Sequence, residues 1–384
     1  MVKPKKSSAS GKATVEELIK KHEGVLDFGD SEIFEYSRIP FDIPALDKML
    51  GGGVPTKRLS IFAGASNAGK SYLAMQAVVQ VQKTGGTAVW IDAEMSWDAT
   101  WATKCGIDVT KILVVQPSNG EEAFDLMESL MKDQVDLIVL DSIAGLVPKA
   151  ITEEDYDHNP MAWQARFMNR SLPRIIPHLK HGSAVIFINQ MRAGIGPIDF
   201  LQRMPGGQGQ GFYSHLVLEV RRNGWITEKD VKVGFDVQIR NRKAKIDSVH
   251  QGDCIVPFKF GGGFDIIETF IREAIQHDFI QKGGAWYTIP GVETRFQGMG
   301  NVKQHYVDNP EDFASLTAMV YSKDKSFGDL LPEGDDITDE DFQNKVTEIS
   351  VESHNQTGGI TTGVVVSNLY DQEDPNYLPI GYGE

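Results

Sequence analysis

The sequence predicts an α/β protein with a central, mostly parallel β-sheet. From Leu59 to about Asp247, short apolar runs that suit buried strands alternate with helical patterns. Five runs carry almost no charge, as parallel strands buried on both faces do: 59–63, 88–91, 112–115, 137–140 and 184–188. Two later runs alternate apolar and charged residues, which predicts antiparallel strands at one edge: 216–220 and 231–239.

The first of these strands leads into a glycine-rich loop that matches the G-x-x-x-x-G-K-[ST] phosphate-binding motif. Its backbone N–H groups can surround phosphates, its lysine adds a charge near the terminal phosphate, and its last hydroxyl can bind Mg²⁺. A helical pattern from Tyr72 to Lys83 follows, as the motif requires, whereas a chance glycine-rich turn is the alternative. The expected nucleotide contacts are Gly64, Ala65, Ser66, Asn67, Ala68, Gly69, Lys70, Ser71 and Tyr72.

Two further strands end in carboxylates. Asp141 ends the run 137–140, and a carboxylate at the carboxyl end of a parallel strand lies at the ligand edge of the sheet, where it can hold Mg²⁺ with Ser71. The run 88–91 ends in Asp92, Ala93 and Glu94. Glu94 is the candidate general base that activates water, although a solvated loop carboxylate is the alternative, and Asp92 suits a structural role.

The composition limits the class of protein. The chain has 384 residues, 41% of them hydrophobic, which is enough for a large core with a second domain or appendages. No apolar stretch reaches the roughly 20 residues that span a bilayer, so we expect no membrane partner. Two cysteines, Cys105 and Cys254, are too few for a disulfide framework, which fits a cytoplasmic protein.

The negative charge is concentrated at the C-terminus. Residues 332–384 contain twelve carboxylates and a single lysine, Lys345, and so carry −11 of the formal net charge of −15. This tail is expected to be disordered. It could compete with nucleic acid for a basic surface, or it could serve only solubility, and the composition does not separate these alternatives.

Several short segments, taken together, resemble the bacterial RecA recombinases, and bacteriophage recombinases of the UvsX type are similar in plan. They occur in RecA order with similar gaps from about Ser37 to about Glu311: Ile91-Asp92-Ala93-Glu94, Val139-Leu140-Asp141-Ser142, Phe187 to Arg192, Lys243 to Ile246, Gly284 to Tyr287, and Asp308 to Glu311. The resemblance implies a RecA-like P-loop NTPase core, a short N-terminal helical segment, a small α+β C-terminal domain and an acidic tail.

The resemblance also implies roles in ATP hydrolysis. It implies that Glu94 activates water, that Asp98 and Trp101 hold the adenine, and that Gln190 senses the γ-phosphate. It implies in addition that Lys243 and Lys245 reach the γ-phosphate of the neighbouring subunit. From composition alone, Trp101 could be an ordinary core residue, Gln190 a capping amide, and the two lysines part of a solvated basic face with Arg240 and Arg242.

Two loops are candidates for DNA contacts, at about 151–163 and 190–211. The second contains six glycines and two arginines, and we expect a mobile loop whose cations suit a strand of phosphates. Phe200 or Ile198 could insert between bases. The candidate DNA-binding residues are Met161, Arg166, Asn169, Arg170, Arg192, Arg203, Gly206 and Gly207.

Four regions follow from these patterns. They are a basic N-terminal segment with an oligomerisation helix (1–36), the ATPase core (37–260), a small C-terminal domain (261–331) and the tail (332–384). The resemblance implies an ATP- and Mg²⁺-dependent recombinase that forms a helical filament on single-stranded DNA and pairs it with homologous duplex DNA. Single-strand-binding and loader proteins are further expected partners. A hexameric helicase or clock-type ATPase on the same core, and a non-catalytic ATP-assembled scaffold, are the alternatives.

Overall fold

The computed structural model describes residues 15–22, 28, 31, 34–149, 160–191, 204–246 and 252–322. It divides before Arg38 into two parts, each of which is described by itself. In the first part, the expected N-terminal helix is present as α1, Val15–Lys21, and none of its residues is buried. The acidic tail lies outside the described residues.

The second part is built on a nine-stranded sheet in the order β11-β10-β9-β8-β3-β7-β6-β4-β5. The strands from β8 to β5 in this order are parallel, and those from β8 to β11 are antiparallel. Their bounds are β3 Leu59–Gly64, β4 Ala88–Asp92, β5 Ile112–Val115, β6 Leu137–Asp141, β7 Ala184–Gln190, β8 Leu216–Glu228, β9 Val231–Ala244, β10 Asp253–Lys259 and β11 Gly263–Phe264. The five predicted parallel strands are therefore confirmed.

The expectation for 216–220 was partly wrong. This segment begins β8, which pairs antiparallel with β9 as expected but parallel with β3 on its other side, with Ser60 opposite Leu216. The charge of Glu219 gave the appearance of a half-exposed edge strand. Glu219 is in fact buried and paired with Arg221 and Arg242. Strands β10 and β11 then extend the sheet to Phe264, four residues beyond the predicted end of the core.

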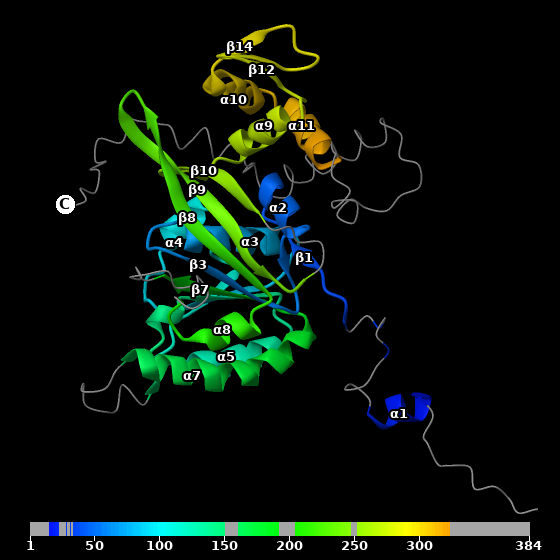
Figure 1. Ribbon diagram of the computed structural model, residues 1–384, viewed down its shortest axis with the longest axis vertical. Coiled ribbons are helices and arrows are strands. Elements are labelled where there is room, and N and C mark those ends of the chain that lie inside the picture. Colours follow the sequence, from blue (N-terminus) through cyan, green and yellow to red (C-terminus); the bar gives the residue numbers. More distant parts are fainter. Residues whose placement is uncertain are drawn as a thin grey trace, which may run out of the picture. The chain divides into compact units, whose positions relative to one another are not determined.

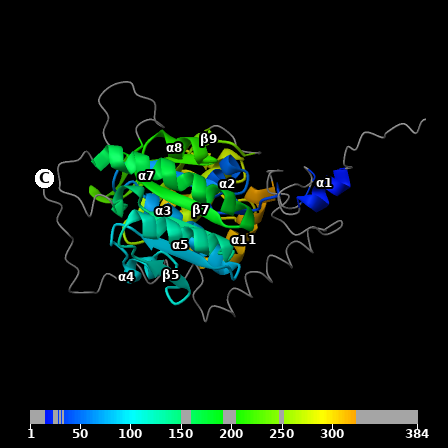
Figure 2. The same cartoon turned by 90° about the horizontal axis from the view of Figure 1, so that it is seen from below.

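Helices cover both faces of the sheet (Figures 1 and 2). One face carries α2 Pro44–Leu50, α3 Lys70–Lys83 and α4 Ala99–Lys104; the other carries α5 Gly120–Lys132, α7 Pro160–Ile175 and α8 Gln208–Tyr213. Alternate side chains of β3 serve the two layers: Ile61 and Ala63 pack with α5 and α7, whereas Phe62 packs with α2 and α3. Strands β3, β4, β6 and β7 are thus buried on both faces, which accounts for their nearly uncharged sequences.

A smaller α+β unit follows the sheet and has its own hydrophobic core. Its elements are α9 Ile266–Gln276, β12 Gln281–Gly283, β13 Trp286–Thr288, β14 Arg295–Gln297, α10 Met299–Asp308 and α11 Pro310–Ser322. Asp265 caps α9 and pairs with Lys303 of α10, while Arg272 of α9 lies 3.3 Å from Asp236 of β9.

The remaining elements of the second part are short: β1 Arg38–Ile39, β2 Val54–Pro55, and the 3-10 turns η2 Ile143–Gly145 and η3 Ile176–His181.

Among the described residues, no helix combines the length and the apolar composition that crossing a membrane requires.

Candidate functional site

The strands that carry the predicted nucleotide residues end at the same edge of the sheet. Gly64 at the end of β3 lies opposite Gln190 at the end of β7. Asp92 at the end of β4 lies opposite Asp141 at the end of β6. Because parallel strands present their carboxyl ends to one crevice, this register brings the phosphate loop, the carboxylates and the amide of Gln190 to a common edge.

Two positions of the phosphate loop favour glycine. A Cβ atom on Gly64 would lie 2.0 Å from the carbonyl oxygen of Val220, and Gly69 has a φ of 96°. Lys70 Nζ donates to the Ala65 carbonyl at 2.6 Å and so closes the loop. Helix α3 begins at Lys70 with no side-chain cap, which leaves its first N–H groups available to an anion. This cradle fits a chain of phosphates.

A hydroxyl and a carboxylate meet beside this loop. Asp141 accepts a hydrogen bond from Ser71, and burial raises the pKa of Asp141 to about 6, with the charge of Glu94 adding to the rise and Ser71 and Lys70 opposing it. Burial lowers the pKa of Lys70, whereas the charges of Asp141 and Glu94 raise it. Serine hydroxyls and carboxylates are oxygen ligands of the kind that Mg²⁺ prefers, so Ser71 and Asp141 fit a magnesium–nucleotide complex.

Glu94 is held at the site by two donors. Its Oε1 atom accepts hydrogen bonds from the Ser142 hydroxyl and, at 2.7 Å, from Gln190 Nε2. Glu94 itself is exposed. A carboxylate with an accessible second oxygen can orient and deprotonate water, so the arrangement is chemically suited to a general base.

Asp92 is fully buried and has a different environment. It accepts hydrogen bonds from the backbone N–H groups of Ser96 (3.1 Å) and Trp97 (2.9 Å) and from Gln116 Nε2 (2.9 Å). Burial alone would raise the pKa of Asp92, but these donors outweigh it and lower the pKa. Asp92 thus holds the backbone that leads to Asp98, which suits a structural role.

The two candidate adenine residues lie at the start of α4. Asp98 caps this helix by accepting from the N–H groups of Thr100 (2.8 Å) and Trp101 (3.0 Å). The half-buried ring of Trp101 lies 6.1 Å from the ring of Tyr72. Tyr72 is itself buried, edge-on to Phe258 and Phe264, so a nucleotide contact by Tyr72 would have to come from its backbone.

Lys243 and Lys245 bind the C-terminal end of α8. Lys243 Nζ donates to the carbonyls of Gly211 and, at 2.7 Å, Ser214, while Lys245 Nζ donates to the Phe212 carbonyl at 2.9 Å. Burial and the charge of Lys245 lower the pKa of Lys243 to about 8. Lys243 is half-buried and Lys245 is exposed, and both ammonium groups donate to open carbonyls at a helix end.

The expectation of a mobile loop from 190 to 211 was wrong for residues 208–211, which are helical. Residues 208–213 form α8, and Gly206 and Gly207 precede it. A Cβ on Gly207 would lie 3.0 Å from Ala165 Cβ of α7, and one on Gly206 would lie 2.1 Å from Gln210 Nε2. The glycines therefore permit close packing in this segment. Asn189 fixes the segment by donating to the Pro205 carbonyl at 3.0 Å.

The remaining DNA candidates fall into two groups. Arg166, Asn169 and Arg170 are exposed on α7, whereas the intervening Phe167 and Met168 are buried. The first candidate loop ends in helix, because α7 begins at Pro160. Residues 151–159 of the first loop and residues 192–203 of the second lie outside the described residues. The same is true of the side chains of Met161, Arg192 and Arg203.

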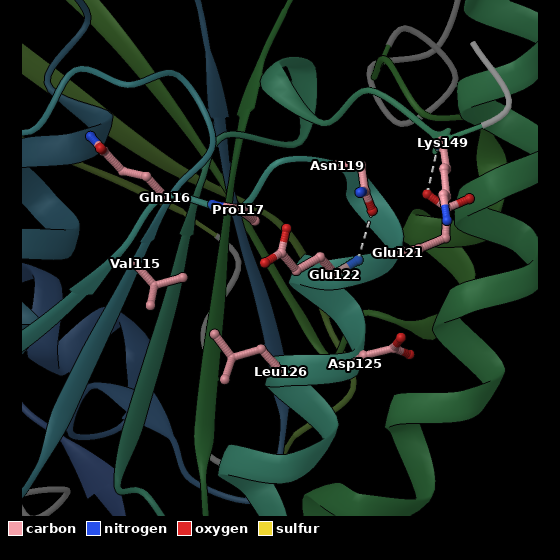
Figure 3. Close-up of a pocket in the computed structure, with 9 residues that line it drawn as sticks. All are labelled: Val115, Gln116, Pro117, Asn119, Glu121, Glu122, Asp125, Leu126 and Lys149. Atoms are coloured by element: carbon pink, nitrogen blue, oxygen red, sulfur yellow. Dashed lines mark hydrogen bonds between the residues drawn. The ribbon is translucent and has the colours of Figure 1, made fainter. Parts of the chain in front are cut away.

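The sequence did not indicate a cavity of about 530 Å³ near the end of β5 and the start of α5 (Figure 3). None of the predicted nucleotide residues lines it. Asn119 caps α5 there by accepting from the Glu122 N–H at 2.9 Å, and the Lys149 N–H donates to Glu121 at 2.8 Å. The lining residues are Val115, Gln116, Pro117, Asn119, Glu121, Glu122, Asp125, Leu126 and Lys149.

Comparisons with known proteins agree with this geometry. The family model of the RecA N-terminal domain matches residues 12–264. Protein RecA of Acinetobacter baumannii is 35% identical over 291 residues, which cover 75% of this chain and 83% of that protein. Protein RecA of Leptospira meyeri is 37% identical over 299 residues, covering 72% of this chain and 75% of that protein. The chain therefore belongs to the RecA family, whose members bind ATP and DNA and act in DNA recombination and repair.

Proposed function

We propose that this protein is an ATP-dependent recombinase that forms a helical filament on single-stranded DNA, pairs it with homologous duplex DNA and exchanges strands. The observation that carries the proposal is the meeting of Lys70, Glu94 and Asp141 at one sheet edge of a RecA-family chain. Hydrolysis of ATP to ADP and phosphate would be stimulated by DNA.

In this proposal the chain's own residues divide the work of hydrolysis. The loop N–H groups and Lys70 hold the phosphates, and Glu94 orients and deprotonates the attacking water. Ser71 and Asp141 would hold Mg²⁺, which neutralises charge between the phosphates when it is bound. Gln190 is hydrogen-bonded to Glu94 at 2.7 Å and is the last residue of β7, before the segment that leads to α8. Exchange of its amide from Glu94 to a γ-phosphate oxygen would couple nucleotide state to that segment.

DNA would lie along α7 and the two candidate loops. Arg166, Asn169 and Arg170 share an exposed side of α7 and can contact the phosphate backbone without reading sequence. Met161, Arg192, Arg203, Gly206 and Gly207 complete the proposed DNA-binding set. Bound ATP would stabilise the conformation that binds DNA, and hydrolysis of ATP would allow the DNA to dissociate.

Assembly would complete the active site. The N-terminal segment, residues 1–36, is proposed to dock on a neighbouring copy, and Lys243 and Lys245 are proposed to reach the γ-phosphate held by that copy. Both lysines would first have to leave the carbonyls of α8, to which they donate in the single chain. We propose the cytoplasm as the location, with single-strand-binding and loader proteins as partners.

Electron microscopy with single-stranded DNA and a slowly hydrolysed ATP analogue tests this function. An open right-handed helix is the expected result, whereas closed rings would contradict the recombinase and favour a ring helicase. A parallel measurement of ATP turnover with and without DNA should show stimulation by DNA. Turnover that DNA does not change would favour a scaffold that uses ATP only for assembly.

A further inference from the structure

The hairpin of β8 and β9 contacts the phosphate loop at its beginning, middle and end. At the beginning, the backbone of Val220 leaves no room for a Cβ on Gly64, at a distance of 2.0 Å. At the end, the side chain of Val237 lies 3.6 Å from the Cβ position of Gly69. In the middle, Arg222 Nη2 donates to the carbonyl of Asn67 at 3.3 Å.

The contact of Arg222 is the only polar one of these three. Asn67 has a φ of 55°, a conformation that costs free energy for a residue with a side chain. A hydrogen bond to the Asn67 carbonyl from outside the loop can therefore help to hold the backbone in this conformation. Arg222 lies outside the phosphate-binding motif, and the sequence did not indicate it.

Two aromatic rings lie beside the guanidinium of Arg222, whose side chain is otherwise exposed. Its Cζ atom lies 4.6 Å from the ring centroid of Trp225 and 4.8 Å from that of Phe235. Phe235 stacks on Phe258 with centroids 5.0 Å apart, and Phe258 meets Tyr72 of α3 edge-on at 5.2 Å. The two rings are nearly perpendicular to each other, at 84°, and both lie within cation–π distance of the guanidinium. The planar guanidinium holds its N–H donors in a fixed arrangement and so loses little freedom when one of them forms a hydrogen bond, which a lysine ammonium does not match.

We propose that Arg222 is a positioning residue that holds the phosphate loop in its nucleotide-accepting shape through the Asn67 carbonyl. The inference rests on the proposed nucleotide-binding function of the loop. A carbonyl is an acceptor, so the hydrogen bond restrains the backbone and leaves the N–H groups of the loop to the phosphates. Trp225 and Phe235 contribute by orienting the side chain of Arg222.

The test combines ADP binding with hydrogen exchange of the loop amides in the full chain without DNA. Arg222→Ala is expected to weaken Mg²⁺–ADP binding about five- to tenfold and to speed exchange in residues 64–71 of the ADP-free protein. Arg221→Ala is the matched control, because it removes the same charge from the neighbouring position. Its ion-pair partner, the buried Glu219, is still paired with Arg242 in this variant. We expect this control to change ADP affinity less than twofold.

Two further variants separate positioning from charge. Arg222→Lys keeps the charge but replaces the planar guanidinium and its fixed donors by an ammonium group, so it should recover only part of the affinity. Trp225→Leu keeps Arg222 and should show a smaller loss in the same direction. Full recovery by lysine, or weaker ADP binding with unchanged loop exchange, would overturn the inference, as would equal effects of Arg222→Ala and Arg221→Ala. Wild-type protein that binds no ADP would contradict the proposed function itself.

Discussion

Glu94 combines an exposed carboxylate with two fixed donors, and substitution by glutamine tests its proposed role at the smallest scale. Glu94→Gln keeps an oxygen that can accept from Ser142 and Gln190, but its amide cannot take a proton from water. We expect ATP and DNA binding to persist while DNA-stimulated phosphate release falls by about two to four orders of magnitude.

The control for this substitution is Glu121→Gln, which changes a half-buried glutamate of the cavity in Figure 3. It should leave phosphate release unchanged. Near-normal turnover in Glu94→Gln would remove Glu94 from the mechanism and leave the water-activating group to be found elsewhere.

Asp141 illustrates a cost to stability at the same site. Burial raises its pKa from 3.8 to about 6, so between these values the native state binds more protons than the unfolded chain. The contribution of Asp141 to the free energy of unfolding therefore falls as pH rises from about 4 to 6 and stays unfavourable at neutral pH.

Asp141→Asn removes this buried charge. In magnesium-free buffer at pH 7.5, we expect the variant to unfold with a free energy about 1–3 kcal/mol higher than the wild type. The same variant should bind Mg²⁺–ATP poorly, because it lacks the proposed carboxylate ligand of Mg²⁺. Residues that are needed for function often lower the stability of the folded protein in this way. Denaturant unfolding across pH 4–8 measures the first effect; a variant less stable than the wild type throughout this range would contradict it.

At the scale of the elements, Gly120 provides a test of how α5 and α7 fit together. A Cβ at Gly120 would lie 2.7 Å from the ring of Phe167, which is buried in α7 beside the exposed Arg166. Gly120→Ala should therefore lower the free energy of unfolding by about 1–3 kcal/mol, as overpacking does. Gly224→Ala is the control, because its Cβ would meet no atom within 4 Å. Equal stabilities of the two variants would show that Phe167 moves freely.

The elements also show what sequence patterns can and cannot predict. The parallel strands were predicted because apolar runs reflect burial on both faces. Glu219 misled the interpretation of β8, since pairing with two arginines in space makes a buried charge tolerable. The glycines at the start of α8, Gly206 and Gly207, misled it as well, because a sequence does not distinguish a glycine that permits close packing from one that permits motion. The hydrogen bond from Arg222 to Asn67 spans 155 positions, beyond the reach of any local motif.

At the scale of the whole molecule, the tail is predicted to regulate DNA binding through charge. Residues 332–384 carry −11 of the net charge of −15. If the tail competes with DNA for basic side chains, its removal should strengthen binding to single-stranded DNA at moderate salt, with a smaller difference at high salt because ions screen both interactions. Fluorescence anisotropy measures this affinity. Unchanged binding would assign the tail to solubility.

The proposed role of Lys243 and Lys245 across a subunit boundary is tested by mixing two inactive variants. Protein with Glu94→Gln has intact lysines, and protein with Lys243→Ala and Lys245→Ala has an intact glutamate. In a head-to-tail assembly, some boundaries would join the intact glutamate of one copy to the intact lysines of the next. An equal mixture should thus recover about a quarter of wild-type ATP turnover, since one of four random neighbour pairs has this order. If the lysines act within their own chain, for example only by holding α8, no boundary restores a site and the mixture stays inactive.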